Sequence, residues 1–247
     1  MEPTAAPDTI RVASFNIRRA MDARDRLQLR ALRRAAVSLD PDILGMQEVE
    51  CRRWHTRFVN QAAYVARALG ARQVFAPIRP PGPILRGYGN ALIARGAIEQ
   101  FVVRPLPGSR DRQPRVALFA QVTVRGAQLS VAVTHLQTHP RRLQHLPGEA
   151  PAQLDAVLGW LTERPAPRLL VGDFNLEPPL VEPVLRAAGF DIAATGFAFP
   201  ASGPTRQVDY IAVDGMRIVS ASVAPEVGVS DHRAIVATLE VPRRVQS

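Results

Sequence analysis

Acids, amides and histidines stand at the ends of strongly apolar segments throughout this chain. The residues in these positions are Asn16, Glu48, His135, Asp173, Asn175, Asp209, Asp231 and His232. Burying a charged side chain beside core strands is costly unless the group is paired or holds an ion. One such residue is usually a satisfied core group or a turn cap, but the repetition of the pattern favours a shared functional site.

The oxygen donors in this set suit a hard cation. Glu48, Asp231 and Asn16 offer carboxylate and amide oxygens, and the single cysteine, Cys51, excludes both a disulfide scaffold and a Cys-rich zinc site. Donors of this kind favour Mg²⁺, with Mn²⁺ as a substitute, over zinc.

The remaining polar residues indicate water chemistry at a phosphate. Asp173 and Asn175 are two residues apart, so they share one face if the strand continues through them. Asp231 beside His232, with a second aspartate elsewhere, fits one carboxylate on a metal and another that orients the imidazole. A hard cation together with amides, imidazoles and arginines indicates hydrolysis of a phosphate ester.

The apolar patterns predict one α/β domain that is rich in strands through its middle. Strands are expected near 10–15, 42–46, 72–76, 90–94, 98–103, 115–124, 127–134, 169–171, 207–213, 217–224 and 235–241. Helices are expected near 27–39, 62–69, 151–161 and 178–188. We expect this domain to span residues 10–241, between a disordered or extended segment 1–9 and a tail 242–247. The loops 77–89 and 138–150, rich in Pro, Gly and Arg, are expected to border a cleft.

The charge of the chain is carried by arginine alone. All 31 basic residues of the 247 are arginine, and the formal net charge is +9. The absence of lysine excludes P-loop phosphate transfer and Schiff-base chemistry. The positive charge fits a nucleic acid or another polyanion as partner, but a codon bias toward arginine would give the same composition. No apolar run is long enough to span a membrane and no secretory signal is visible, so a cytoplasmic protein without a membrane anchor is expected.

Several short motifs, taken together in their order along the chain, resemble a known superfamily. They are Ser14–Arg18 (SFNIR), Gln47–Val49 (QEV), Gly89–Leu92 (GNAL), Thr134–Leu136 (THL), Gly172–Asn175 (GDFN), Val208–Ile211 (VDYI) and Ser230–His232 (SDH). On these motifs the chain resembles the endonuclease/exonuclease/phosphatase superfamily, the DNase I-like metal-dependent phosphoesterases. The resemblance implies a four-layer αββα sandwich, in which two mixed β-sheets pack face to face with helices outside. It also implies a site at one end of the sheets.

The resemblance assigns a role to each polar strand-end residue. Glu48 would be the principal Mg²⁺ ligand, with Asn16 and Asp231 close to the ion. Asp173 would orient or deprotonate the attacking water, and Asn175 would hold a phosphate oxygen.

Imidazoles and further phosphate contacts complete the implied site. His232, held by Asp209, would contact the phosphate and act as acid or base, and His135 would be a second imidazole there. Which group takes the proton stays open. Three residues are candidates to bind the substrate phosphate; they are Arg18, Asn90 and Arg115. Two of them also have an ordinary structural interpretation, Asn90 as a turn residue and Arg115 as a solvated arginine at the start of a strand.

The reaction class is more strongly indicated than the substrate. A nuclease that acts on DNA or RNA fits the charge, whereas a phosphodiesterase or phosphatase on lipid headgroups or inositol phosphates, similar to sphingomyelinases, is the alternative. A catalytically silent binding protein of the same fold is the third possibility. We expect a monomer. Other polar or aromatic residues are expected to be surface, loop or core groups; they are His55, His139, His145 and Trp160.

Overall fold

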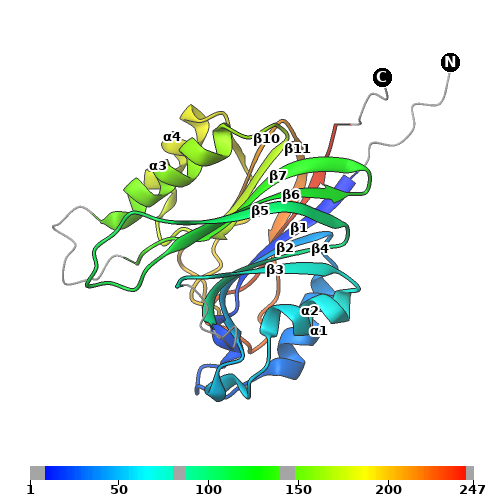
Figure 1. Ribbon diagram of the computed structural model, residues 1–247, viewed down its shortest axis with the longest axis vertical. Helices are drawn as coiled ribbons and strands as arrows, with labels where there is room; N and C mark the ends of the chain where they lie inside the picture. The colour runs from blue at the N-terminus through cyan, green and yellow to red at the C-terminus, as the bar shows by residue number, and fades with distance from the viewer. Residues whose placement is uncertain (1–8, 80–86, 139–147, 243–247) are drawn as a thin grey trace.

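The computed structural model describes residues 9–79, 87–138 and 148–242. Its elements form two β-sheets, each covered on its outer side by helices (Figure 1). The expected segments 1–9 and 242–247, and the histidines His139 and His145, lie wholly or largely outside the described residues.

The first sheet joins both ends of the chain. Its strand order is β11-β12-β1-β2-β4-β3. The strands are β1 Thr9–Asn16, β2 Ile43–Cys51, β3 Arg72–Pro77, β4 Gly87–Ala94, β11 Arg217–Val223 and β12 Ile235–Glu240. β1 and β2 run parallel and the other pairings are antiparallel, so the sheet is mixed.

The second sheet is built from the middle of the chain. Its strand order is β5-β6-β7-β8-β10-β9. The strands are β5 Ala97–Pro105, β6 Val116–Val124, β7 Ala127–His135, β8 Arg168–Asp173, β9 Asp191–Ile192 and β10 Asp209–Asp214. Only β7 and β8 pair in parallel among the described strands of this sheet.

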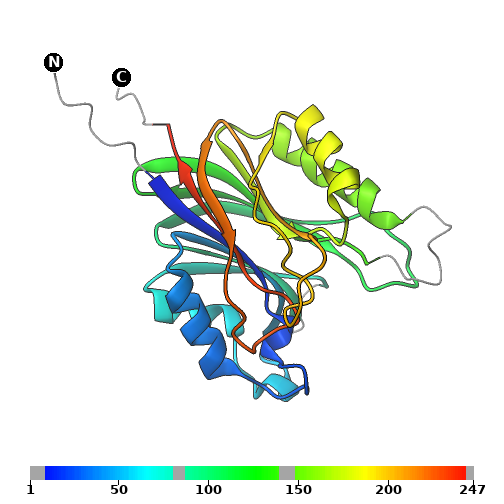
Figure 2. The same cartoon turned by 180° about the vertical axis from the view of Figure 1, so that it is seen from behind.

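Two helices cover each sheet. α1 (Leu29–Leu39) and α2 (Gln61–Leu69) pack on the first sheet, and α3 (Glu149–Thr162) and α4 (Pro178–Ala187) pack on the second (Figure 2). A third apolar cluster lies between the sheets. The expected four-layer αββα sandwich is therefore confirmed.

Local sequence accounts for the helix limits. On α1 the residues Leu32, Ala35, Ala36 and Leu39 recur at helical spacing, and they are the buried ones. At the start of α2 the side chain of Asn60 accepts a hydrogen bond from the Ala63 amide, which caps the helix.

The two sheets approach closely at the centre of the sandwich. A Cβ atom on Gly45 of β2 would lie 2.4 Å from Cγ2 of Val171 on β8, well inside contact distance. Glycine at this position therefore allows the inner faces to meet and sets the separation of the strands that end at the site.

Short elements that the sequence did not predict are β9 and the 3₁₀ turns η1 (Arg18–Ala20) and η2 (Trp54–Thr56).

Candidate active site

The sheet topology brings the polar strand ends together. Because β1 runs parallel to β2 and β7 parallel to β8, the carboxyl ends of these strands lie at one end of the sandwich. Asn16 ends β1, His135 ends β7 and Asp173 ends β8. Asp209 begins β10 directly opposite Asp173, because β10 is antiparallel to β8.

A β-bulge aims Glu48 out of its strand. The pairing of β2 with β4 loses register between Met46 and Val49, and Glu48 has a φ of 55°. A non-glycine residue in the left-handed region carries backbone strain of about 1–3 kcal/mol. This backbone conformation directs the half-buried Glu48 side chain toward Asn16, whose Nδ2 donates to Glu48 Oε1 at 3.3 Å.

Asp173 and Asn175 are positioned by a sharp turn rather than by a continuing strand. β8 ends at Asp173, and Asn175 has a φ of 52°, so the expected shared strand face is not present. The Asn175 amide donates to Asp173 Oδ1 at 3.0 Å, and its side-chain Nδ2 donates to the Leu136 carbonyl at 3.0 Å. Both side chains still border one cavity.

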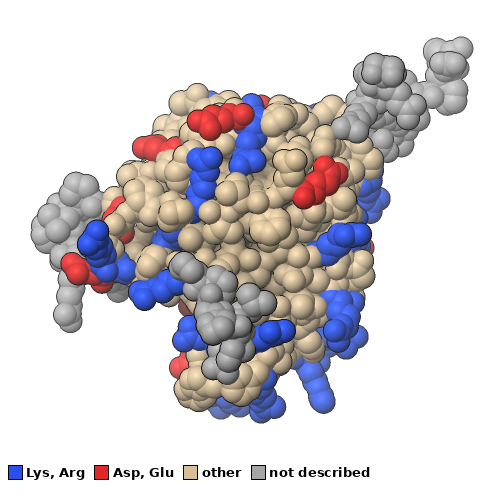
Figure 3. Space-filling view, viewed as in Figure 1, with Lys and Arg blue, Asp and Glu red and all other residues tan. Residues whose placement is uncertain are grey.

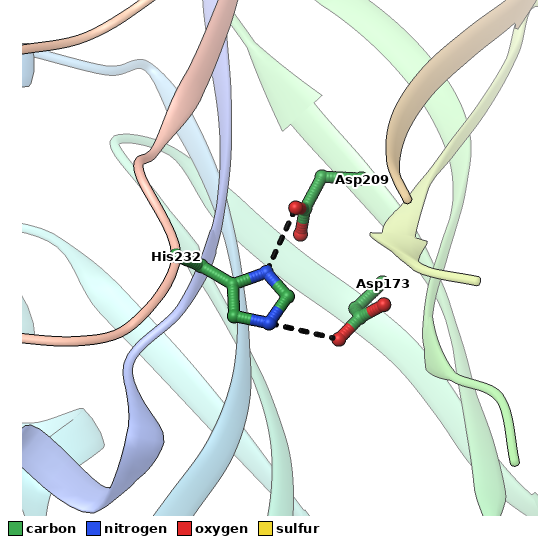
Figure 4. A group of neighbouring side chains, drawn as sticks. All are labelled: Asp173, Asp209 and His232. Atoms are coloured by element: carbon green, nitrogen blue, oxygen red, sulfur yellow. Dashed lines mark hydrogen bonds and ion pairs between the residues drawn. The ribbon is translucent and has the colours of Figure 1, made fainter. Parts of the chain in front are cut away.

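His232 lies between two buried carboxylates (Figure 4). Its Nδ1 is 2.8 Å from Asp209 Oδ2, and its Nε2 is 3.6 Å from Asp173 Oδ2. Burial by itself lowers the pKa of His232, but the charges of Asp209 and Asp173 more than offset this and raise the pKa to about 10. The imidazole is therefore a cation at neutral pH in the metal-free protein.

The pKa of Asp173 is raised toward neutrality. Burial raises the pKa of Asp173 to about 6, while the His232 cation and hydrogen bonds from Asn16 and Asn175 act in the opposite direction. An acceptor with this pKa is matched to proton transfer at neutral pH.

His135 has the opposite electrostatic character to His232. Burial, followed by the positive charges of Arg115 and His232, holds the pKa of His135 well below its usual range. An Arg115 guanidinium nitrogen lies 3.1 Å from Nδ1 of His135, and because a guanidinium only donates, that ring nitrogen is the acceptor. The proton of the neutral ring is then on Nε2, 3.5 Å from Asp173 Oδ2.

Asn16 bridges the two sheets through its amide nitrogen. Its Nδ2 donates to Asp173 Oδ2 at 2.9 Å as well as to Glu48, while its Oδ1 accepts from the Arg18 amide at 3.0 Å. In this arrangement Asn16 presents N–H groups to the two carboxylates, and its oxygen faces its own backbone.

These side chains border a cavity of about 460 Å³, which we call the catalytic cavity. Of the residues expected at the site, those on its wall are Glu48, Arg115, His135, Asp173, Asn175, Asp231 and His232. Glu48 and Asp231 thus face the same space, and Asn16 and Asp209 lie buried behind it.

Two expected phosphate contacts are not among the residues that border this cavity. The guanidinium of Arg18 donates to the Asp22 carbonyl, pairs with Asp25 at 3.0 Å and lies 3.8 Å from Asp231. Asn90 is buried and its Nδ2 donates to the Val116 carbonyl, linking the two sheets at 3.0 Å. Asn90 thus lies within β4 and is not the turn residue of its ordinary interpretation.

Other residues of the cavity wall were not expected from the sequence. Arg19, next to Arg18, borders the cavity, and its buried Nε has no hydrogen-bond partner among the described residues. Tyr88 faces the same space, where burial and then the charge of Glu48 raise its pKa. His55, expected to be a loop residue, contacts the buried Glu50 at 2.5 Å on this wall. In the sequence, a tyrosine directly before Gly89-Asn90 could have indicated Tyr88 as a site residue. Nothing in the sequence could have indicated Arg19, because its place on the wall depends on the left-handed turn at η1.

Two groups of side chains could hold a cation. Donor atoms of Asp173, Asp209 and His232 all lie within 4.8 Å of one another, and this buried group could hold a metal ion. His232 Nδ1, however, is already hydrogen-bonded to Asp209, and a ring nitrogen cannot both donate that bond and coordinate, so only Nε2 of this ring could be a ligand. Glu48 and Asp231 offer carboxylate oxygens to the cavity without such a conflict, so their chemistry fits a hard cation better.

Comparisons with known proteins agree with this fold and these motifs. Solved structures that resemble this one include an endonuclease/exonuclease/phosphatase from Beutenbergia cavernae (21% identity, TM-score 0.73, covering 94% of this chain and 72% of that chain). A mannosyl-6-phosphatase from Bacteroides thetaiotaomicron matches at 18% identity and a TM-score of 0.75, covering 93% of this chain and 99% of its own. D. rerio TDP2 in complex with a single-strand DNA product matches at 20% identity and a TM-score of 0.69, covering 94% and 99%.

No curated protein matches the sequence. The model of the Endonuclease/Exonuclease/phosphatase family matches residues 13–232, which include all of the motifs described above. That match covers most of the chain, and the chain belongs to the endonuclease/exonuclease/phosphatase family.

Proposed function

We propose that this protein is a divalent-metal-dependent phosphodiesterase that cleaves nucleic acid, DNA or RNA, by attack of water on a phosphate. The observation on which this depends is that the catalytic cavity continues on both sides. It shares Arg53, Tyr88 and Gln113 with a hollow of about 610 Å³, and Asn175, Phe199 and His232 with one of about 750 Å³. A phosphodiester has a substituent on each side of its phosphorus, whereas a phosphate monoester has only one. A site that is open on two sides therefore suits a phosphodiester better than it suits a monoester.

The proposal includes a Mg²⁺ ion, for which Mn²⁺ could substitute, held by Glu48 and Asp231. When bound, such an ion neutralises phosphate charge and stabilises the leaving oxygen. Asn16 orients Glu48 through its amide, as the 3.3 Å hydrogen bond indicates.

Protein groups supply the proton transfers in this proposal. Asp173, with a pKa of about 6, accepts the proton of the attacking water. The cationic His232, fixed by Asp209, faces the phosphate and supplies a proton to the leaving oxygen. Arg115, only 7% exposed, contributes a guanidinium to the phosphate oxygens. Asn175, at the turn after β8, borders the cavity and holds a phosphate oxygen in this proposal.

The net charge of +9 favours a polyanionic substrate within this proposal. A phosphatase acting on sugar, lipid-headgroup or inositol phosphates is the second candidate, and the resemblance to a mannosyl-6-phosphatase favours it. Among the described residues no helix is long and apolar enough to cross a membrane. A cytoplasmic location and a monomeric state remain predictions from the sequence.

A substrate panel tests the proposal. The protein is incubated with plasmid, single-stranded DNA, RNA, bis-p-nitrophenyl phosphate, mannose 6-phosphate and sphingomyelin, each with Mg²⁺ and then with EDTA. We expect metal-dependent cleavage of nucleic acid and of the nitrophenyl diester. Hydrolysis of sphingomyelin or mannose 6-phosphate without any nucleic-acid cleavage would refute the nuclease assignment.

Two variants connect the observed activity with the cavity. Glu48→Gln should lower turnover by about two orders of magnitude or more while leaving the fold intact. Glu99→Gln, a matched change on the edge strand β5, should retain activity, because Glu99 is exposed, hydrogen-bonds to Thr123 and Gln128, and does not border the catalytic cavity. Equal losses in both variants would point to an effect on folding rather than on the site.

A further inference from the structure

Arginines surround the hollow that extends from one side of the catalytic cavity. This hollow, here called the arginine groove, has a volume of about 610 Å³. Its basic residues are Arg53, Arg79, Arg110 and Arg112. They come from the segment after β2, the segment after β3 and the β5–β6 connection. Asp111 is the only acid among the described residues that border the groove.

Half of these guanidinium groups have no carboxylate partner among the residues that the structure describes. Arg53 lies 3.4 Å from Glu50, and Arg112 lies 4.0 Å from Glu149 and donates to the Thr138 carbonyl. Arg79 and Arg110 are exposed, and no carboxylate lies within 4.0 Å of either in the described part of the chain. Space-filling Figure 3 shows arginine side chains on both sides of the hollowed left edge of the molecule.

The hollow on the other side of the catalytic cavity has a different character. Its wall includes the apolar residues Leu176, Leu180 and Val208. Its one arginine among the described lining residues, Arg206, is paired with Glu177 at 2.7 Å. Among the described residues, arginines without a carboxylate partner are thus concentrated on one side of the catalytic cavity.

We propose that the arginine groove binds a second phosphate of the substrate, on the side of the scissile phosphate that faces Tyr88 and Gln113. Both residues border the groove as well as the catalytic cavity, so the two spaces are continuous and one substrate can occupy both. Guanidinium groups match phosphate oxygens in geometry and charge, and Arg79 and Arg110 have their donors free of carboxylates. This inference rests on the proposed phosphodiesterase function.

A second phosphate can come from two sources. In a nucleic-acid strand it is the neighbouring backbone phosphate, and in a small molecule it is another phosphate on the same compound. An oligonucleotide represents the first source. A nucleoside 3′,5′-bisphosphate, which contains no phosphodiester bond, represents the second and is used as a competitor for binding, and bis-p-nitrophenyl phosphate is the reference substrate with a single phosphate.

The test uses two double variants that change net charge equally. Arg79→Gln/Arg110→Gln alters the groove. Arg30→Gln/Arg33→Gln is the control, since both residues are exposed on α1, outside the groove. We expect the groove variant to lower the ratio of kcat/KM on an eight-residue oligonucleotide to kcat/KM on bis-p-nitrophenyl phosphate about tenfold, and the control to leave this ratio within about twofold.

Equilibrium binding supplies a second measurement that does not need turnover. The anisotropy of a fluorescent oligonucleotide is followed in EDTA at several salt concentrations. Loss of two phosphate contacts should reduce the slope of log K against log salt by about 1.4 for a single strand. The control variant should keep the wild-type slope.

The outcomes separate this inference from the proposed function. In the groove variant, a selective loss of oligonucleotide cleavage, of competition by the bisphosphate for oligonucleotide binding, or of both supports the groove and identifies the source of the second phosphate. Equal losses in the two double variants, or an unchanged ratio in the groove variant, overturn the inference while leaving the phosphodiesterase intact. If the wild type cleaves no phosphodiester, the proposed function fails, and the binding measurement still decides whether the groove holds phosphate.

Discussion

Replacing Asp209 with asparagine tests the electrostatic arrangement of the site. Asp209 is 1% exposed, and its Oδ2 accepts a hydrogen bond from Nδ1 of His232 at 2.8 Å. The Asp209→Asn variant keeps an acceptor oxygen in place but removes the negative charge. The other carboxylate oxygen, Oδ1, has no hydrogen-bond partner among the described residues, so the new amide also buries an unsatisfied N–H group.

The size of the effect follows from the pKa of His232. Burial lowers that pKa, and Asp209 is first among the groups that raise it to about 10 from the ordinary value of 6.5. Without this charge we expect the pKa to fall by at least about 2 units, which corresponds to about 2.7 kcal/mol between the two protonation states. At pH 9 His232 would change from mostly protonated to mostly neutral. At this pH activity should fall by about 10²–10⁴, because His232, the proposed general acid, loses both its charge and its orientation.

The same shift predicts a pH dependence of stability. A folded-state pKa above the unfolded value means that protonated His232 stabilises the fold fully below pH 6.5, and that this contribution disappears as pH rises through about 10. Its upper limit is about 5 kcal/mol for the wild type. The Tm of wild type should therefore fall between pH 6.5 and 10, and in Asp209→Asn most of this decline should disappear.

The measurement is an NMR titration of the histidine ring signals in metal-free protein, with His232 assigned from a His232→Asn variant, followed by pH profiles of activity and Tm. Asp214→Asn is the control, because Asp214 lies at the other end of β10 and pairs with Arg168. A His232 pKa near 10 in Asp209→Asn would refute the reasoning. So would activity within a few-fold of wild type.

Three further predictions address the cation, the bulge and the sheet packing. EDTA should abolish activity, and Mg²⁺ or Mn²⁺ should restore it and raise the Tm, since an ion bound only by the folded protein stabilises it; a Tm that does not respond to metal would argue against a site at Glu48 and Asp231. Glu48→Gly should raise the free energy of unfolding by up to about 1 kcal/mol while eliminating activity, because glycine adopts the φ of 55° without strain; chemical denaturation checks this, and Glu48→Gln, which keeps the Cβ, should show no such gain. Gly45→Ala should destabilise the fold by about 1–3 kcal/mol, because its Cβ would lie 2.4 Å from a methyl group of Val171; a denaturation midpoint equal to wild type would show that the sheets separate easily there.

The layers of the fold could be predicted from the sequence because local patterns determine them. Apolar alternation marks β6 and β7, and the helical spacing of α1 determines which of its residues are buried. The two-residue strand β9 could not be predicted in this way. A strand so short has no periodicity, and it exists because its backbone pairs with Ala212 and Val213 of β10.

Convergence of the site residues could be predicted, but their hydrogen bonds could not. The position of Asn16 after an apolar strand indicates a site residue. Only the fold shows that its side-chain amide joins Glu48 to Asp173, which is 157 positions from Asn16 along the chain. Arg18 and Arg19 illustrate the same limit. Neighbouring arginines look equivalent in sequence, and the three consecutive positive φ angles of Arg18, Arg19 and Ala20 decide that Arg19, rather than Arg18, faces the catalytic cavity.

Backbone strain explains why the chemistry of this site depends on the whole fold. Glu48 and Asn175 both occupy the left-handed region, one at the bulge of β2 and the other at the turn after β8. Each would relax in an isolated segment, so the packed sheets must hold both against a combined cost of about 2 kcal/mol or more. Close contact of the sheets at Gly45, on the same strand as Glu48, is one source of that constraint. A loosened sandwich should therefore lose activity before it loses secondary structure, since relaxation of Glu48 would turn its carboxylate away from Asn16.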